Sequence, residues 1–162
     1  MFLPLTVMKV SLVNMNKIEP KSKGPSEHLT WAELACKDKV KTSYPEQFIL
    51  DGRVFKLALM FEDIRALWQK PIIIHSAYRT PAHNKAVGGA KNSQHVQGRA
   101  LDLAPPQGVK LDTFYAAIKR NTDDFGIHGI GKYLTFVHVD IRPTDKLIVW
   151  RGNGVKDSSL DI

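Results

Sequence analysis

The sequence predicts a single α+β domain in which a small antiparallel sheet is flanked by helices. The 162 residues are 43% hydrophobic, which suffices for one domain with a real core. Some stretches carry apolar residues at helical spacing, whereas several short stretches alternate between apolar and polar residues as strands do. These elements do not follow one another as a regular strand–helix–strand series, which favours a mixed arrangement.

Along the chain, we expect an N-terminal extension and linker over residues 1–27, a folded domain over 28–150 and a C-terminal tail over 151–162. Residues 17–29 are polar and contain two prolines and a glycine, as linkers do. Residues 1–16 are more apolar, but they lack the basic start and the small-residue cleavage site of a signal peptide. We therefore expect a terminal strand or a poorly ordered extension there, without a conventional signal peptide.

Three helices are expected. Thr30 and Glu33 form a capping box, which starts a short helix from Trp31 to about Cys36. A longer helix follows Pro45, because apolar residues then recur at helical spacing and form a core stripe. The residues of this stripe are Val54, Leu57, Ala58, Phe61, Ile64, Leu67 and Trp68. A further amphipathic helix is expected from Leu111 to Lys119.

Four short stretches are expected to be strands. Residues 72–74 form an apolar run typical of a buried strand, residues 99–104 and 136–142 alternate, and residues 147–150 fit a last edge strand. Residues 127–132 are rich in glycine and are interpreted as a turn. Between the first two strands, the segment from Ser76 to Gln97 is predicted to be a long loop, and such loops tend to carry function.

Composition narrows the classes of function. The single cysteine, Cys36, excludes an intrachain disulfide and every thiolate-rich zinc module. Lys and Arg outnumber Asp and Glu by 23 to 16, and the formal net charge of +7 favours a polyanionic partner. Nucleic acid is not expected, because no DNA- or RNA-binding motif accompanies the basic residues. No apolar run approaches the ~20 residues that span a bilayer, so stable membrane insertion is not expected either.

Two expected strands carry acidic and histidine side chains on one face. The strand at 99–104 places Asp102 opposite its leucines, and the strand at 136–142 places His138 and Asp140 opposite its valines. An unpaired charge there is costly, which leaves two interpretations: a hydrogen-bonded pair or a bound cation. With His95 from the preceding loop, two imidazoles and one carboxylate would leave a fourth tetrahedral position for water, as in catalytic zinc sites.

A motif decides between these interpretations. Residues 93–102 read SQHVQGRALD and match the pattern SxHxxGxAxD, and residues 138–140, HVD, match the element that accompanies it. In these motifs the sequence resembles the zinc D-Ala-D-Ala peptidase family (M15), which has the Hedgehog/DD-peptidase fold, and most closely its phage and prophage peptidoglycan peptidases. The resemblance extends from about His28 to Arg142. Its further blocks are LTWAELAC at 29–36, SAYRT at 76–80 and GIGKY at 129–133.

The resemblance implies a role for several residues. His95, Asp102 and His138 are the implied ligands of one zinc ion. Arg79 stands where the family has an arginine that holds a substrate carboxylate or carbonyl, a task that suits the planar fork of a guanidinium. Ser93 is implied to lie beside the site, where its hydroxyl either binds substrate or stabilises a turn.

The general base does not carry over directly. Many family members have an acidic residue three positions before the last histidine, but this chain has Thr135 there. Asp140 is the nearest carboxylate on the same strand face, so it is a candidate catalytic base or a group that orients a ligand. His128 is a further candidate.

The resemblance implies a zinc peptidase that cuts amide bonds in peptidoglycan peptide stems or crosslinks, with residues 28–150 as the peptidase domain. We expect a monomer, made in the cytoplasm of a bacterial host and acting on the cell wall after release. One alternative is a catalytically inactive wall-binding or structural module on the same fold, which Thr135 permits. A basic nucleic-acid binder is a more distant alternative, supported by charge alone. The bond that is cut stays open.

Overall fold

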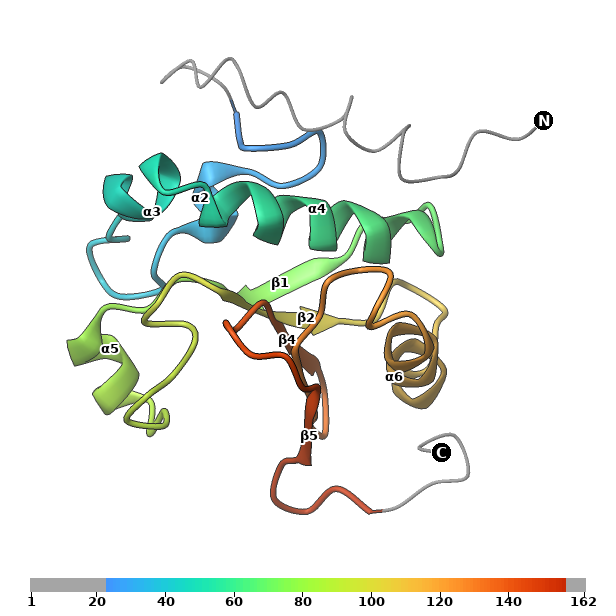
Figure 1. The fold of residues 1–162 in the computed structure, drawn as a ribbon. Coiled ribbons are helices and arrows are strands. Elements are labelled where there is room, and N and C mark those ends of the chain that lie inside the picture. The colour runs from blue at the N-terminus through green and yellow to red at the C-terminus, as the bar shows by residue number, and fades with distance from the viewer. Residues whose placement is uncertain (1–22, 157–162) are drawn as a thin grey trace.

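The computed structural model describes residues 23–156 and shows one α+β domain built on a five-stranded sheet (Figure 1). The predicted fold class is confirmed. The N-terminal strand or extension predicted for residues 1–16 lies outside the described residues. The helices are α2 (Trp31–Leu34), α3 (Glu46–Leu50), α4 (Arg53–Ala66), α5 (Pro81–Ala86) and α6 (Leu111–Arg120). The strands are β1 (Ile73–Ser76), β2 (Ala100–Ala104), β3 (Gly129–Lys132), β4 (Val137–Asp140) and β5 (Ile148–Arg151).

The sheet has the strand order β1-β2-β4-β3-β5. Neighbouring strands from β1 to β3 are antiparallel, as the sequence predicted, but β5 pairs with β3 in parallel. β4 is therefore the central strand, and β1 and β5 are the edges. The predicted edge strand at 147–150 is present as β5, and it continues to Arg151.

One face of the sheet is buried against helices. Alternate residues of β2 and β4, Leu101, Leu103, Val137 and Val139, belong to the same hydrophobic core as the inner residues of α4 and α6. Figure 1 shows α4 lying across the sheet and α6 beside it. Because side chains alternate along a strand, the residues between these core positions lie on the other face, away from the core.

The first helix begins as predicted. The Thr30 hydroxyl accepts a hydrogen bond from the Glu33 N–H, and the Glu33 carboxylate accepts one from the Thr30 N–H, so the capping box is complete. This helix ends at Leu34 and not at Cys36, because Ala35 already has extended backbone angles.

The predicted long helix after Pro45 is two helices, α3 and α4. They are separated at Asp51 and Gly52, where Gly52 has a φ of 83° that a helix interior does not allow. The apolar stripe from Val54 to Ile64 is buried on α4, as predicted. Leu67 lies beyond the helix and is 42% exposed, so it does not belong to the core.

Three further predictions need correction. The apolar run at 72–74 is not a buried strand: it begins the edge strand β1, in which Ile74 is buried but Ile73 is 64% exposed. The long loop from Ser76 to Gln97 contains α5, which starts at a Thr80 cap followed by a proline. The glycine-rich segment at 127–132 is mostly the strand β3, buried throughout its length. No helix in the described part of the chain is long and apolar enough to cross a membrane.

Candidate metal centre

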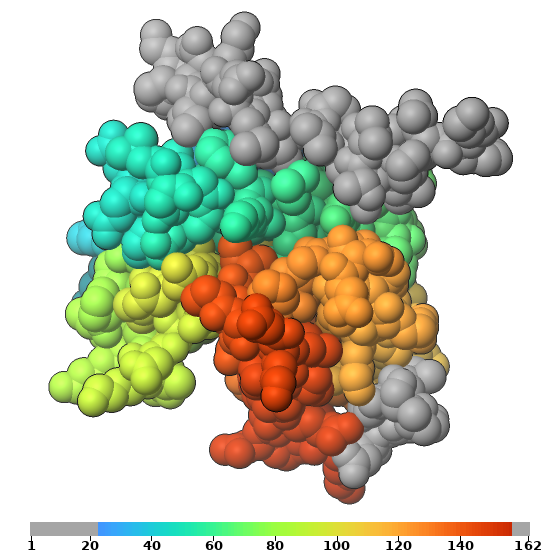
Figure 2. Space-filling view, viewed as in Figure 1, coloured from blue at the N-terminus to red at the C-terminus, as the bar shows by residue number. Residues whose placement is uncertain are grey.

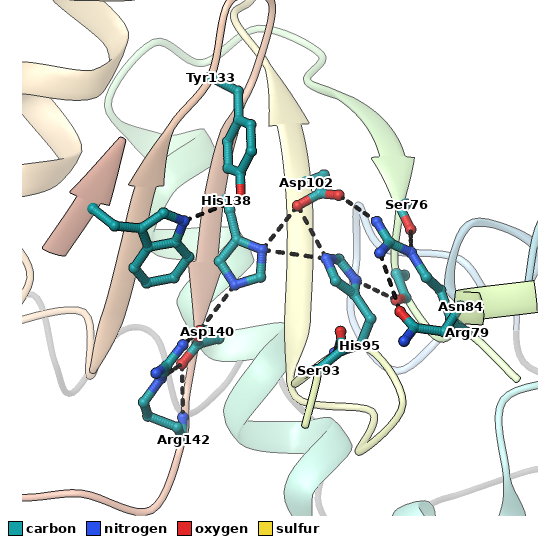
Figure 3. Close-up of polar contacts among 12 residues, drawn as sticks. Ser76, Arg79, Asn84, Ser93, His95, Asp102, Tyr133, His138, Asp140 and Arg142 are labelled. Atoms are coloured by element: carbon teal, nitrogen blue, oxygen red, sulfur yellow. Dashed lines mark hydrogen bonds and ion pairs between the residues drawn. The ribbon is translucent and has the colours of Figure 1, made fainter. Parts of the chain in front are cut away.

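Two strands and one loop bring together the three side chains that the motif marked. Asp102 on β2 and His138 on β4 are direct partners in the antiparallel register, on the sheet face opposite the core. His95 reaches them from the loop before β2. Its Nε2 atom lies 3.0 Å from Asp102 Oδ1 and 3.2 Å from His138 Nδ1, and these last two atoms are 2.9 Å apart (Figure 3). All three residues are buried.

The loop that carries His95 is fixed at its far end by Gly98. This residue has a φ of 63°, which favours glycine, and a Cβ atom there would lie 2.5 Å from the Phe48 ring and 2.8 Å from the Tyr44 hydroxyl. The Tyr44 hydroxyl also donates a 2.6 Å hydrogen bond to the Gly98 carbonyl. The His95 carbonyl accepts a hydrogen bond from the Arg79 N–H. Backbone contacts thus hold the histidine over the sheet.

Outer partners determine which ring nitrogens carry hydrogen. His95 Nδ1 lies 2.6 Å from the Ala77 carbonyl oxygen, which can only accept, so this nitrogen is the donor. His138 Nε2 lies 2.9 Å from Asp140 Oδ2 and donates to that carboxylate. In their neutral forms, both histidines therefore direct a lone pair at each other and at the Asp102 carboxylate. Three converging lone pairs repel one another unless a proton or a cation lies among them.

The charges around this cluster favour a cation. Burial lowers the pKa of His95. Burial acts in the same direction on His138, but hydrogen bonds to Asp102 and Asp140 outweigh it and raise the pKa of that histidine. Burial alone would raise the pKa of Asp102, but hydrogen bonds with His138 and His95 hold it well below its ordinary value. Asp102 is therefore a carboxylate at neutral pH.

The donor atoms also fit zinc by type and spacing. Within residues 23–156, His95, Asp102 and His138 form a group whose ligand atoms lie within 4.8 Å of one another. A tetrahedral zinc ion with bonds of about 2.0–2.2 Å separates its ligand atoms by about 3.3–3.6 Å, slightly more than the 2.9–3.2 Å found here. Two imidazoles and one carboxylate leave the fourth position to water or substrate, as catalytic zinc sites do.

Arg79 contacts the second oxygen of Asp102. Its Nη2 donates a 2.9 Å hydrogen bond to Asp102 Oδ2, while its Nε donates to the Ser76 hydroxyl. Nη1 lies 3.5 Å from the Asn84 side-chain oxygen. The guanidinium thus orients the Asp102 carboxylate, and Arg79 also lines a cleft.

Asp140 lies behind His138. Its side chain is fully buried, Oδ2 accepts from His138 Nε2, and both oxygens accept from the Arg142 guanidinium at 2.8 and 2.6 Å. Burial would raise the pKa of Asp140, but the hydrogen bonds from Arg142 and His138 hold it below its ordinary value. Gly129 leaves room for the carboxylate, because a Cβ atom there would lie 2.3 Å from Asp140 Oδ2.

A cleft of about 580 Å³ opens onto the three candidate ligands. Arg79 and Ser93 line it on the α5 side, and the aromatic residues Tyr133, Phe136 and Trp150 line the opposite side. Figure 2 shows the surface hollowed between the segment around α5 and the segment around β5. Ser93 accepts a hydrogen bond from the His95 N–H, so it stabilises the turn and still presents its own hydroxyl hydrogen.

The other candidate for a general base, His128, lies outside this cleft, and so does Thr135, which stands where many family members have an acidic residue. Thr135 is exposed and does not line it. His128 donates through Nδ1 to the Arg142 carbonyl and lines a separate pocket of about 610 Å³. Within the described part of the chain, Asp102 is the only carboxylate that lines the cleft.

The sequence had not singled out Tyr133 or Trp150 as site residues. Trp150 was expected only as the end of an edge strand, and Tyr133 only as part of a matching block. The alternate glycines of β3 were a usable signal, since glycine within a strand indicates a close approach by another group. Gly129 faces Asp140, and a Cβ atom at Gly131 would lie 2.5 Å from the Trp150 indole.

A sequence model of the family described as Peptidase M15 matches residues 27–140. The matched segment contains all three candidate ligands and Arg79, and it ends before β5. No curated protein matches the chain.

Proposed function

The chain belongs to the peptidase M15 family of zinc metallopeptidases, and from this we propose that it hydrolyses amide bonds in the peptide stems or crosslinks of bacterial peptidoglycan. The observation that carries this proposal is the convergence of His95 Nε2, Asp102 Oδ1 and His138 Nδ1 at the floor of a cleft. Hydrogen bonds on the far side of each ring direct a lone pair into that point, which is the arrangement that a metal ion needs.

His95, Asp102 and His138 would hold one zinc ion. Bound there, zinc supplies a Lewis acid and lowers the pKa of a coordinated water to about 7. The protein side chains supply orientation. Arg79 fixes Asp102 so that Oδ1 faces the two histidines, and its free N–H groups suit a substrate carbonyl or carboxylate.

Asp140 suits orientation of His138 better than proton transfer. Its oxygens are fully buried and already accept hydrogen bonds from His138 and Arg142, so no substrate atom reaches them. A carboxylate that accepts from the outer nitrogen of a ligand histidine fixes the ring and makes the inner nitrogen a better ligand. We therefore assign Asp140 to the support of His138.

The test compares the parent chain with His95→Ala, and uses His83→Ala as the matched control. His83 lies on α5 and does not line the cleft. We expect the parent to bind one zinc ion per chain. It should also release new amino groups from purified peptidoglycan, and a chelator should abolish this release. His95→Ala should lose both properties, whereas His83→Ala should keep both. Full activity of a metal-free His95→Ala protein would refute the proposal.

The same experiment distinguishes the proposed peptidase from the alternative, a catalytically inactive wall-binding module. Zinc retention and binding to the wall, without any release of amines, would support that alternative. If amines are released, mass spectrometry of the digested muropeptides distinguishes a terminal D-Ala from a link within the stem or a crosslink.

A further inference from the structure

We propose that Tyr133 is a further catalytic residue of this site, whose phenol O–H donates a hydrogen bond to the substrate oxygen that gains negative charge, and that Trp150 positions it. This inference rests on the proposed peptidase function. It assigns a donor to the side of the cleft opposite Arg79.

The ring of Tyr133 is held by two neighbours, Phe136 and Gly152. It stacks on Phe136 with 4.5 Å between ring centroids and 9° between ring planes. On another side it lies against Gly152, where a Cβ atom would approach the ring to 2.4 Å. The Tyr133 N–H also donates to the Phe136 carbonyl. A ring held in this way cannot turn freely, so its hydroxyl has a defined place at the wall of the cleft.

In the part of the chain that the structure describes, the Tyr133 hydroxyl has one hydrogen-bond partner, and this partner leaves the hydroxyl hydrogen available. Trp150 Nε1 lies 3.0 Å from the Tyr133 hydroxyl oxygen, and an indole nitrogen only donates. The phenol oxygen is therefore the acceptor in this bond. Among residues 23–156, no acceptor is found for the phenol hydrogen itself. Figure 3 shows the hydroxyl end of Tyr133 directed toward the side of the site that holds His138.

Trp150 connects this hydroxyl to the metal centre. Its indole lies on the space left by Gly131 and has its ring centroid 5.0 Å from that of His138. The Arg142 guanidinium carbon lies 5.2 Å from the centroid of the same indole. Arg142 also binds Asp140, the carboxylate that supports His138. Trp150 is therefore fixed between Arg142 on one side and the Tyr133 hydroxyl on the other.

Hydrolysis of an amide places negative charge on the former carbonyl oxygen. A fixed donor aimed at that oxygen stabilises this charge more than it stabilises the neutral substrate, and therefore raises kcat. Tyr133 keeps its proton throughout, so it forms or breaks no covalent bond. Because the Arg79 guanidinium is engaged by Asp102 and Ser76, a second donor from the opposite wall is chemically useful.

The test uses Tyr133→Phe, which removes only the hydroxyl, with Tyr78→Phe as the matched control. Tyr78 is buried away from the cleft. We expect Tyr133→Phe to lower kcat about 100-fold on a defined stem peptide, with KM and zinc content nearly unchanged. Tyr78→Phe should retain the parent kcat. A Tyr133→Phe kcat within threefold of the parent, with zinc bound, would overturn the catalytic role.

A double-mutant cycle tests the positioning role of Trp150. Trp150→Phe keeps an aromatic ring on Gly131 but removes the indole N–H, so it should lower kcat by less than Tyr133→Phe does. In the Tyr133→Phe background, Trp150→Phe should not lower kcat further, because the hydroxyl that Trp150 positions is already absent. Equal losses in both backgrounds would show that Trp150 acts by packing alone.

A binding measurement keeps this inference separate from the proposed function. A phosphinate analogue of a stem dipeptide carries tetrahedral, negatively charged oxygens, and its Kd for the zinc-loaded protein can be measured by calorimetry without turnover. We expect Tyr133→Phe to weaken this binding about tenfold or more, and Tyr78→Phe to leave it unchanged. If the parent cuts no wall amide, the proposed function fails, while an equal Kd for parent and Tyr133→Phe overturns the role of Tyr133.

Discussion

The carboxylate of Asp140 shows how one residue of this chain controls another. Its position behind His138 makes it a support for that ring, and this role predicts a particular pattern in the Asp140→Asn variant. The amide cannot match the charge of the carboxylate opposite His138 and Arg142, so we expect zinc affinity to fall about 10- to 100-fold.

Activity at saturating zinc separates orientation from catalysis. Asp140→Asn should then regain most of the parent kcat, because the ligand set itself is intact. Asp145→Asn, a change at an exposed carboxylate, is the control and should match the parent in both measurements. A large loss of kcat with zinc fully bound would instead identify Asp140 as the base.

Site residues that belong to a sequence motif were easier to predict than residues whose role depends on packing between strands. His95, Asp102 and His138 stand at fixed spacings in a recognisable string, and the structure brings their ligand atoms together. Trp150 belongs to no such string. Its role depends on a parallel pairing with β3 and on the space left by Gly131, and local sequence does not reveal which strands will pair.

At the scale of elements, the loop before β2 is tied to α3 through Gly98, and this contact predicts a stability difference between two glycines. Gly98→Ala and Gly88→Ala both place a side chain at positive φ, which costs about 1–2 kcal/mol. Only at Gly98 does the new Cβ atom also collide, with Phe48 and Tyr44. We therefore expect Gly98→Ala to lose about 1–3 kcal/mol more than Gly88→Ala.

Urea unfolding of both zinc-free variants measures this difference. Because the same loop carries His95, Gly98→Ala should also bind zinc more weakly, whereas Gly88→Ala should not. Equal unfolding free energies for the two variants would mean that the loop can move away from α3 at little cost.

Helices and strands that neighbouring residues encode were predicted correctly, whereas those that depend on distant contacts were not. The capping box at Thr30 and the alternating strand at β2 are encoded by neighbouring residues, so the sequence predicted both. The break between α3 and α4 depends on one glycine within an otherwise helical pattern. The strand β3 was mistaken for a turn, because its glycines make room for Asp140 and Trp150 instead of bending the chain.

For the whole molecule, the formal net charge of +7 predicts that attraction to an anionic wall depends on salt. The Debye length falls from about 10 Å at 0.1 M salt to about 3 Å at 1 M, so binding to purified walls should weaken over this range. The triple variant Lys37→Glu, Lys39→Glu and Lys41→Glu changes exposed residues away from the cleft and lowers the formal net charge to +1.

This triple variant should bind walls weakly at low salt and respond little to added salt, as measured by cosedimentation. His95→Ala should keep the salt dependence of the parent, because it changes the metal site and not the surface charge. Wall binding by the parent that does not change with salt would exclude electrostatic attraction as its cause.

The position of β5 gives the two sides of the cleft different freedom. The candidate ligands Asp102 and His138 belong to β2 and β4 in the interior of the sheet, whereas Trp150 belongs to an edge strand paired on one side only. Edge elements open locally at lower free energy than central ones. The contacts of Trp150 with Gly131, His138 and Arg142 counter this freedom and keep the Tyr133 hydroxyl in place, while the central strands keep their part of the ligand set in place.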